Sequence, residues 1–530
     1  MLKNFLTLFL IIFYTSLNAQ SNIDVLHYKF EIELSDSSDI IKGRASVRVK
    51  FLENTNRFSL QLISKNQKGK GMIAYLVLGE GEPVSSAHGN DTLLIILASP
   101  AKKDEVRTYE ILYQGIPDDG LIISKNKYGE RTFFADNWPN RAHHWLPCND
   151  KPNDKASFEF LVTAPSHYAV ISNGIKTEER EIDNGKRLTH WKEDTSLPTK
   201  IMVIGVASFA TKIFADSPEN IPVSAWVYPQ DSIKVFKNFS GAPAILKFLT
   251  SYIGPYPYEK LANVQSKTVF GGMENASAIF YDENLSSSGT SIESLLAHEI
   301  THQWFGDMAS EKKFSHLWLS EGFATYLTHI YIESKYGTDS LNKEMRDDRE
   351  SVIAFSKDSK QPVVDSISSY RRLLNPNSYQ KGGWVLHMLR RQSGDSVFHK
   401  IIRSYYAAYA GKNADTKDFQ KICEKESGKN LGTFFQQWLY ITGQPKLGVH
   451  WNYDAKNKMI LIKIKQLQNN LFEFPLDIEL KLRSGKSQLQ TLAITKQSQQ
   501  FIVRVKEKPV QIILDPKTSL LFEGTVSKTN

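Results

Sequence analysis

Two histidines four residues apart constrain this chain more than any other feature of its sequence. Residues 297–307 read AHEITHQWFGD, in a chain that has only 13 histidines among 530 residues. On a helix, His298 and His302 lie on one face with about 6 Å between their Cβ atoms, close enough to bind one metal ion. Glu299 follows the first histidine, where its carboxylate can reach a water molecule beside that metal. A random chain of this length would contain H-E-x-x-H in about one case in a hundred, so we predict that both histidines are zinc ligands.

The residues before this segment predict that it is helical. Residues 290–293 read TSIE, the pattern of a capping box, in which a hydroxyl and a glutamate satisfy the free amide groups of a helix start. Leu295, Leu296 and Ile300 then follow at helical spacing. We therefore predict a helix that begins at Ser291.

A catalytic zinc site needs a third protein ligand and one open position. One class of zinc enzyme supplies another histidine through H-E-x-x-H-x-x-G-x-x-H, but Phe305 and Met308 stand where that class has glycine and histidine, which excludes it. The alternative is a carboxylate from the next predicted helix, LWLSEGFATYLTHIYIESKYG, which should end at Gly337. Glu321 lies near its start among large apolar residues, where an unpaired charge is costly, so we predict it as the third ligand. The other interpretation is a solvated glutamate in the first turn of a surface helix.

The pattern along the chain predicts a multidomain α+β protein. Its 530 residues exceed the roughly 250–300 at which one hydrophobic core stops growing. Apolar and polar residues alternate with a period of two in short segments up to about residue 228, which predicts a β domain over 20–228. Helical spacing follows and predicts a mainly helical domain over 229–443. The period of two then returns, which predicts a small C-terminal β-sandwich over 444–530.

The first residues have the pattern of a secretory signal peptide. In MLKNFLTLFLIIFYTSLNAQ, Lys3 precedes an apolar run that ends near Phe13, and small or polar residues lead to Ala19. The run is too short to span a bilayer, which takes about 20 apolar residues. We predict that residues 1–19 are removed and that the protein is exported, to the periplasm or outside the cell. No later stretch is expected to span a membrane.

Composition excludes few other classes of function. The net charge of +8 and the pI near 9.0 come from basic residues scattered along the chain, which is typical of a solvated surface, so no nucleic-acid partner is expected. Cys148 and Cys423 are the only cysteines, too few for a disulfide framework. We predict two unpaired, buried thiols. The oligomeric state cannot be read from these features.

The stretch GGMEN, residues 271–275, suggests a place for a peptide. Glycines without side chains let an extended peptide approach and pair with the backbone as an added strand, and Glu274 places a negative charge at the end of that strand. Taken alone, the stretch has a second interpretation as a turn with a solvated glutamate.

With these motifs together, the chain resembles the M1 family of zinc aminopeptidases. The resemblance rests on His298-Glu299-Ile300-Thr301-His302, on Glu321 after eighteen further residues in LWLSEGFATY, and on GGMEN upstream, in the order that the family uses. It implies an N-terminal β saddle domain, a thermolysin-like catalytic domain and a C-terminal β-sandwich. The helical C-terminal domain that is usual in the family is expected to have no counterpart here.

The resemblance also implies roles for individual residues. The predicted substrate-binding residues are Gly271, Gly272, Met273, Glu274 and Asn275, with Glu274 binding the free α-ammonium group of a peptide. Tyr379, in SYQKGGWVLHMLR, matches the tyrosine that donates a hydrogen bond to the oxygen of the tetrahedral intermediate. Asp136 stands where many relatives carry a Gln or Glu that also binds the ammonium group. This departure leaves two interpretations of Asp136, a second contact to the amine or the cap of a local turn.

These roles together predict a zinc-dependent aminopeptidase with one Zn²⁺ per chain. Zinc on His298, His302 and Glu321 would polarise the peptide carbonyl and activate a water, with Glu299 as the general base. The expected partners are peptides with a free N-terminus. Two alternatives stay open: a thermolysin-like endopeptidase, which has no use for Glu274, and a secreted peptide-binding protein without catalytic activity.

Overall fold

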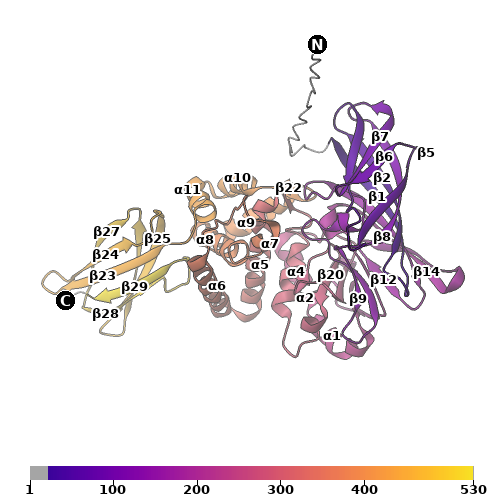
Figure 1. The fold of residues 1–530 in the computed structure, drawn as a ribbon. Coiled ribbons are helices and arrows are strands. Elements are labelled where there is room, and N and C mark those ends of the chain that lie inside the picture. The colour runs from indigo at the N-terminus through magenta and orange to yellow at the C-terminus, as the bar shows by residue number, and fades with distance from the viewer. Residues whose placement is uncertain (1–21, 529–530) are drawn as a thin grey trace, which may run out of the picture.

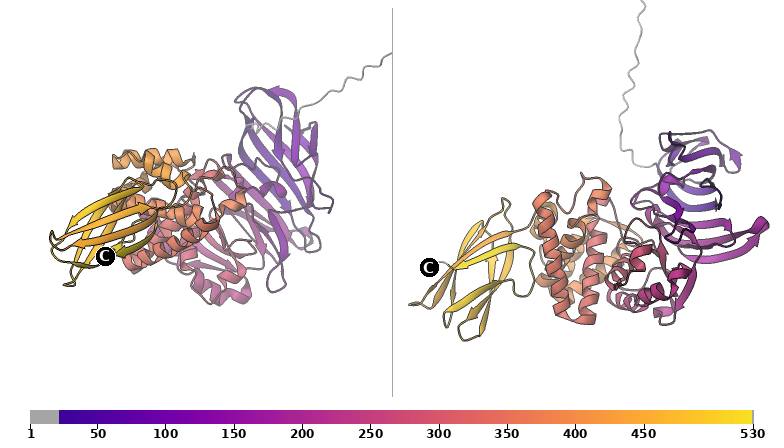
Figure 2. Two further views of the ribbon diagram at one scale, coloured as in Figure 1. Left: turned by 60° about the vertical axis from the view of Figure 1, so that its left-hand side comes forward. Right: turned by 60° about the horizontal axis from the view of Figure 1, so that its bottom comes forward.

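The structure is a computed structural model that describes residues 22–528, and the predicted signal peptide lies outside this range. The chain is elongated and runs from one end of the molecule to the other (Figure 1). Several β-sheets form the N-terminal end, helices occupy the middle, and two further sheets form the C-terminal end (Figure 2). The predicted order of β, helical and β regions is therefore present.

The N-terminal region of the described chain is built from sheets whose strands alternate buried and accessible residues. The eight-stranded sheet has the order β13-β14-β11-β1-β2-β8-β4-β5, with the bounds Ile175–Ile182, Lys186–Pro198, Lys155–Pro165, Ile23–Glu33, Ile41–Phe51, Val106–Ile116, Gly71–Gly79 and Glu82–Pro83. A four-stranded sheet has the order β12-β15-β10-β9 (Ala169–Ser172, Ile204–Ala207, Arg131–Ala135, Leu121–Lys125) and a three-stranded sheet the order β3-β7-β6 (Thr55–Gln61, Thr92–Ala101, Ser86–Gly89). In β1, the side chains of Tyr28, Phe30 and Ile32 are buried, as the period of two predicts.

A five-stranded sheet connects this region to the helices. Its order is β16-β17-β18-β20-β19, with the bounds Ala210–Phe214, Val223–Val227, Leu261–Ser266, Ala278–Asp282 and Gly272–Met273. Strands β17, β18 and β20 run parallel, and β19 pairs antiparallel at one edge. A division of the chain after residue 228 would separate β16 and β17 from the other three strands. The edge position of β19 leaves one side of GGMEN unpaired by the described residues.

The middle region is mainly helical. Its helices are α1 (Ser232–Phe239), α2 (Ala242–Ile253), α3 (Glu283–Ser286), α4 (Glu293–His302), α5 (Trp318–Tyr336), α6 (Thr338–Asp358), α7 (Tyr370–Leu373), α8 (Gly382–Ser393), α9 (Asp395–Tyr409), α10 (Thr416–Ser427) and α11 (Gly432–Phe435), with short π-helical segments η7 (Asn377–Lys381) and η8 (Gln436–Tyr440) and a strand pair β21 and β22 (Ser310–Glu311, Asn413–Ala414). Helix α5 is buried over most of its length and ends at Gly337, as predicted. Helices α4 and α8 both pack against it, and η7 lies beside it.

The predicted start of the zinc-site helix is wrong by two residues. Helix α4 begins at Glu293, and its N-cap residue, Ile292, has no side chain that caps it, although Ser291 Oγ accepts a hydrogen bond of 3.3 Å from Glu293 N. The Glu293 carboxylate accepts hydrogen bonds from Tyr331, Lys335 and Tyr336 instead. Because all three partners lie in α5, tertiary contacts use the glutamate that the capping box would need.

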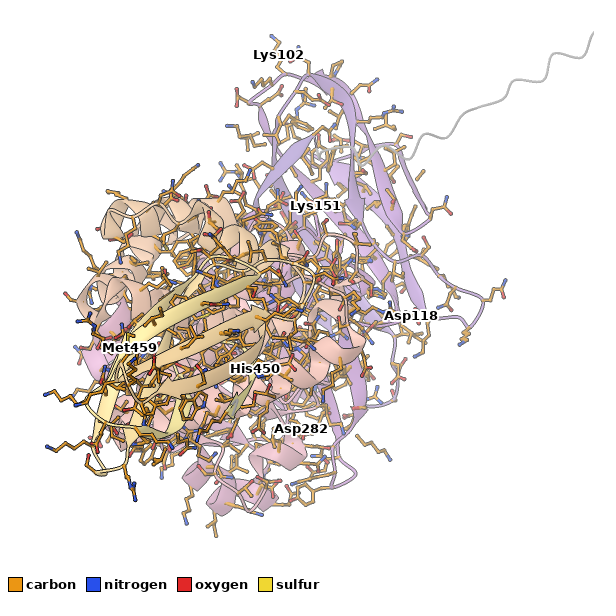
Figure 3. The ribbon with its side chains drawn as sticks, turned by 90° about the vertical axis from the view of Figure 1, so that its left-hand side faces the viewer. Lys102, Asp118, Lys151, Asp282, His450 and Met459 are labelled. Carbon is orange, nitrogen blue, oxygen red and sulfur yellow. The ribbon has the colours of Figure 1, made fainter. Side chains whose placement is uncertain are left out.

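The C-terminal region consists of two sheets. One has the order β27-β24-β23-β29 (Ser498–Arg504, Met459–Gln466, Lys446–Asp454, Glu523–Lys528), and the other has the order β26-β25-β28 (Ser487–Ile494, Phe474–Leu482, Pro509–Leu514). Ile460, Ile462 and Ile464 are buried, in agreement with the predicted alternation. Figure 3 looks along the molecule from this end, with His450 and Met459 in front and Lys102 at the tip of the N-terminal sheets.

The remaining global predictions concern cysteines and membrane spans. Cys148 and Cys423 are both buried and unpaired, which confirms the prediction of two free thiols. Across residues 22–528, none of the helices combines the length and the apolar character needed to cross a membrane.

Candidate active site

Helices α4 and α5 bring the three predicted metal ligands together. The Nε2 atoms of His298 and His302 lie 3.1 Å apart, and Glu321 Oε2 lies 3.4 Å from the first and 3.2 Å from the second. A tetrahedral zinc ion with ligand bonds of about 2.0–2.1 Å requires ligand atoms about 3.3 Å apart. The three atoms therefore already have the spacing of three corners of a zinc coordination tetrahedron.

The groups around these ligands hold them in the state that a metal needs. His302 Nδ1 lies 3.1 Å from the carbonyl oxygen of Phe305 and 3.0 Å from Ser320 Oγ, so an Nδ1–H donates there and Nε2 keeps its lone pair for a metal. Glu321 Oε2 is buried, and no group in the described chain donates a well-formed hydrogen bond to it. A buried carboxylate oxygen without a donor, facing two imidazole nitrogens, fits a divalent cation, and the two-nitrogen, one-oxygen donor set suits zinc.

Glu299 lies beside the three ligands and is almost fully buried. Burial raises the pKa of its carboxyl group well above the usual range, and the carboxylates of Glu274 and Glu321 add to the effect while His302 opposes it. Such an environment is typical of a carboxyl group that must accept and return a proton. Carboxylate oxygens of Glu274 and Glu299 and a ring nitrogen of His302 all lie within 4.8 Å of one another.

The GGMEN stretch lies directly against this cluster. Gly271, Gly272, Met273 and Glu274 line the same cavity as the predicted metal ligands, whereas Asn275 is buried and does not line it. The backbone carbonyl of Glu274 accepts a hydrogen bond of 2.8 Å from Nε2 of Gln303, the residue that follows α4. This bond ties the strand edge that carries Glu274 to the end of α4.

Tyr379 completes the group of predicted site residues around the metal ligands. It lies in η7, and its ring stacks on that of His298 with 5.9 Å between ring centroids. Burial and the neighbouring carboxylates raise the pKa of its phenol well above the usual range. The hydroxyl therefore stays protonated and can donate a hydrogen bond.

The structure does not bring Asp136 to the cavity. Its side chain is fully buried, with one oxygen 2.5 Å from Nη2 of Arg141. The other oxygen accepts hydrogen bonds from Val269 N at 3.0 Å and Thr268 Oγ1 at 3.3 Å. Asp136 thus anchors the loop that leads into Gly271. Its own side chain does not line the cavity.

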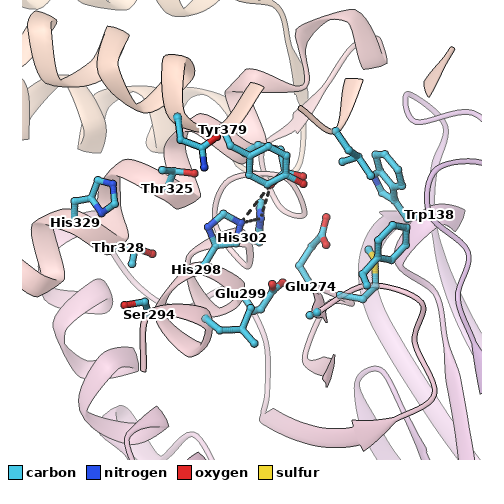
Figure 4. A pocket seen from close by; sticks show the side chains of 18 of the residues that line it. Trp138, Glu274, Ser294, His298, Glu299, His302, Thr325, Thr328, His329 and Tyr379 are labelled. Carbon is cyan, nitrogen blue, oxygen red and sulfur yellow. Dashed lines mark hydrogen bonds and ion pairs between the residues drawn. The ribbon is translucent and has the colours of Figure 1, made fainter. Parts of the chain in front are cut away.

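The cavity itself has a volume of about 480 Å³ and extends beyond the predicted residues (Figure 4). Its lining residues that the sequence analysis did not identify are Trp138, Phe270, Ser294, Leu295, Thr325, Thr328, His329, Asp348, Leu374 and Gln380. Thr325 and His329 follow Glu321 at intervals of four residues, so their position on the same face of α5 is a signal that was present in the sequence.

We expect Gly272→Ala to reduce activity by about ten- to a hundredfold, because small displacements of a reacting group have effects of this size. A Cβ atom at Gly272 would lie 2.3 Å from Glu299 Oε1 and 2.4 Å from its Cδ, so the carboxylate would have to move. Zinc content should stay normal, since no metal ligand is involved. Gly271→Ala is the matched comparison, because its Cβ would meet only Leu285 Cδ2 at 3.3 Å. Equal kcat/KM values for the two variants would contradict this explanation.

Two family models match most of the chain. Residues 238–438 match the peptidase family M1 domain, and residues 25–201 match the peptidase M1 N-terminal domain. The chain belongs to peptidase family M1.

Known proteins with similar sequences are named aminopeptidases. A probable aminopeptidase 2 of Sulfurisphaera tokodaii is 27% identical over 399 residues, which cover 71% of this chain and 50% of the relative. Aminopeptidase M1-C of Oryza sativa subsp. japonica is 29% identical over 329 residues, 58% of this chain and 37% of the relative. Glutamyl aminopeptidase of Rattus norvegicus is 24% identical over 474 residues, 84% of this chain and 50% of the relative. The chain thus matches half or less of the length of these relatives.

Proposed function

We propose that this protein is a zinc-dependent aminopeptidase that removes the first residue from peptides. The observation that carries the proposal is the distance between Glu274 and the catalytic cluster, where oxygens of Glu274 and Glu299 and a nitrogen of His302 fall within 4.8 Å of one another. An ammonium group held by Glu274 leaves room for only about one residue, which spans at most about 3.6 Å, before the reacting carbonyl. A site of this length selects the first peptide bond.

The residues that would hold zinc are His298, His302 and Glu321. Their mutual spacing and the unpartnered oxygen of Glu321 support this assignment. When bound there, zinc supplies Lewis acidity, which polarises a peptide carbonyl and makes water a stronger acid. The fourth position has to stay free of protein ligands for this chemistry.

The side chains of the protein carry the remaining steps. Glu274 forms a charge-assisted ion pair with the α-ammonium group and fixes the start of the substrate. The free edge of β19 can pair with the extended backbone of the peptide. Glu299 takes a proton from the attacking water and returns it to the leaving amine. Tyr379 donates a hydrogen bond from its hydroxyl to the carbonyl oxygen as negative charge develops.

The test compares peptides with a free N-terminus and the same peptides after N-acetylation. We expect hydrolysis of the free peptides only, with loss of the first residue detected by mass spectrometry. Glu274→Gln should lower kcat/KM for free peptides by about ten- to a hundredfold, since a hydrogen bond to a charged group contributes about 1.5–3 kcal/mol. Internal cleavage of acetylated peptides would instead favour the thermolysin-like endopeptidase. Peptide binding without any hydrolysis by the zinc-loaded protein would favour the non-catalytic alternative.

We infer the location of the protein from its first residues alone. The pattern of residues 1–19 supports export, to the periplasm or outside the cell. N-terminal sequencing of the mature protein tests this, with the chain expected to begin after Ala19.

A further inference from the structure

The cavity has a second polar end that the proposed mechanism does not use. In Figure 4, Ser294, Thr328 and His329 lie on one side of His298, and Glu274 and Trp138 lie on the other. A peptide whose amine is held at Glu274 passes the metal ligands with its first peptide bond. Its second residue therefore enters the end of the cavity lined by His329.

A histidine and an aspartate from different helices meet at this end. His329 of α5 is 6% exposed, and its Nε2 lies 2.8 Å from Oδ2 of Asp348 on α6. Since a carboxylate can only accept, the Nε2–H group donates to it. This bond fixes the direction of the Asp348 side chain, which still has 13% of its surface exposed.

The Asp348 carboxylate has capacity for a further partner. Residues 22–528 place no Lys or Arg nitrogen within 4 Å of it, and its second oxygen, Oδ1, receives no hydrogen bond from them. The neighbouring Arg349 is engaged elsewhere, with Asp515 and the carbonyl of Leu520. A carboxylate in a cavity wall with a free oxygen and no cation attracts a positively charged ligand group.

Two threonine hydroxyls add to the polarity of this end. Thr325 and Thr328 are buried on α5 and line the cavity. The hydroxyl of Thr328 has no hydrogen-bond partner in the described chain. A ligand with several hydrogen-bond donors would satisfy these groups, and both lysine and arginine side chains carry such donors and a positive charge.

The distance along α5 favours a long side chain. His329 comes eight residues after Glu321, which corresponds to about 12 Å along a helix that rises 1.5 Å per residue. The backbone of the second residue lies within about one residue length, at most about 3.6 Å, of the reacting carbonyl. The rest of the distance has to be spanned by the side chain, which short residues cannot do.

We propose that Asp348, oriented by His329, is a specificity-determining residue that binds the cationic side chain of a lysine or arginine in the second position of the peptide. The inference rests on the proposed aminopeptidase function and names a substrate class for it. Peptides would then be recognised by two positive charges, the α-ammonium group at Glu274 and the second side chain at Asp348.

The experiment uses the full-length zinc-loaded protein and peptides that differ only in the second residue, which is lysine, glutamine or glutamate. The first residue is the one that the wild type releases fastest from aminoacyl coumarins. We expect kcat/KM to be about tenfold higher for lysine than for glutamine, and lower still for glutamate, because close charge pairs in partly desolvated sites have effects of this size. The Asp348→Asn variant should lose the preference for lysine over glutamine. Asparagine retains an oxygen that can accept the hydrogen bond from His329.

The possible outcomes separate this inference from the proposed function. A wild type without a preference for lysine over glutamine overturns the inference, and so does an Asp348→Asn variant that keeps the preference. The wild-type comparison needs no variant, so the absence of a preference overturns the inference even if Asp348→Asn is unstable. A wild type that prefers lysine over glutamine in the second position and leaves the acetylated peptides intact supports both proposals. Failure of the zinc-loaded wild type on every aminoacyl coumarin and every free peptide overturns the proposed function, and the inference with it.

Discussion

Glu299→Gln is expected to keep its zinc and lose about a hundredfold to ten-thousandfold in kcat, the range found for removal of a general base. Glutamine has nearly the same shape as glutamate, so the packing of the buried side chain against Gly272 should not change. The amide cannot accept a proton from water at neutral pH, and it cannot deliver one to the leaving amine. The metal ligands themselves are untouched by the substitution.

The measurement combines aminoacyl-coumarin hydrolysis with metal analysis of the same preparation. Glu350→Gln, an exposed position on α6, is the matched control and should behave like the wild type in both respects. Turnover of Glu299→Gln close to that of the wild type would exclude the proposed role. Loss of zinc from Glu299→Gln would show that Glu299 acts on the metal site and not on the proton.

The arrangement of the three proposed metal ligands was predictable because local spacing determines it. Two histidines four apart on one helix meet on the same face, and a helix that follows with an acid in its first turn can present that acid to them. The structure places the nitrogens of His298 and His302 and the oxygen of Glu321 within 3.4 Å of one another. Alternation of period two likewise predicted strands such as β1 and β24, because each has one buried face.

Other features depend on contacts between distant segments and were not predictable from local pattern. Glu293 has the position of a capping residue, but Tyr331, Lys335 and Tyr336 donate to it from 38 to 43 residues away. Asp136 holds the loop at Val269, 133 residues away, through a backbone hydrogen bond. The sequence near Glu293 and near Asp136 gives no sign of these distant partners. Local pattern therefore predicted the wrong helix start at Glu293 and left two interpretations of Asp136 open.

The pair of His329 and Asp348 was predictable only in part from the sequence. The interval of four residues from Glu321 through Thr325 to His329 places all three on one face of α5, and this was readable. The pairing with Asp348 depends on how α6 folds back against α5 after Gly337, which only the structure shows. A polar residue that continues the helix face of a proposed metal ligand is therefore a useful sequence signal for a residue that lines the same cavity.

Glu321→Gln is expected to lose zinc and, with it, more than a hundredfold in activity. Substitution of groups that merely orient a metal ligand costs about ten- to a hundredfold in affinity or activity, and Glu321 is itself a proposed ligand. Its Oε2 is the one anionic donor among the three, buried and without a hydrogen-bond donor in residues 22–528. A neutral amide there removes the charge that balances a divalent cation, and its NH₂ group can point toward the imidazoles instead of an oxygen.

The Glu299→Gln and Glu321→Gln variants therefore form a matched pair. We expect the first to retain zinc and the second to lose it. After dialysis against a weak chelator, Glu321→Gln should contain little zinc, while Glu299→Gln and the wild type should retain about one ion per chain, as a single three-residue site implies. Added zinc in excess should restore part of the activity of Glu321→Gln, because binding is weakened and not chemically abolished, and should restore none to Glu299→Gln. Retention of zinc by Glu321→Gln with normal turnover would mean that another group supplies the third ligand, and the spacing of His298, His302 and Glu321 would then need a different explanation.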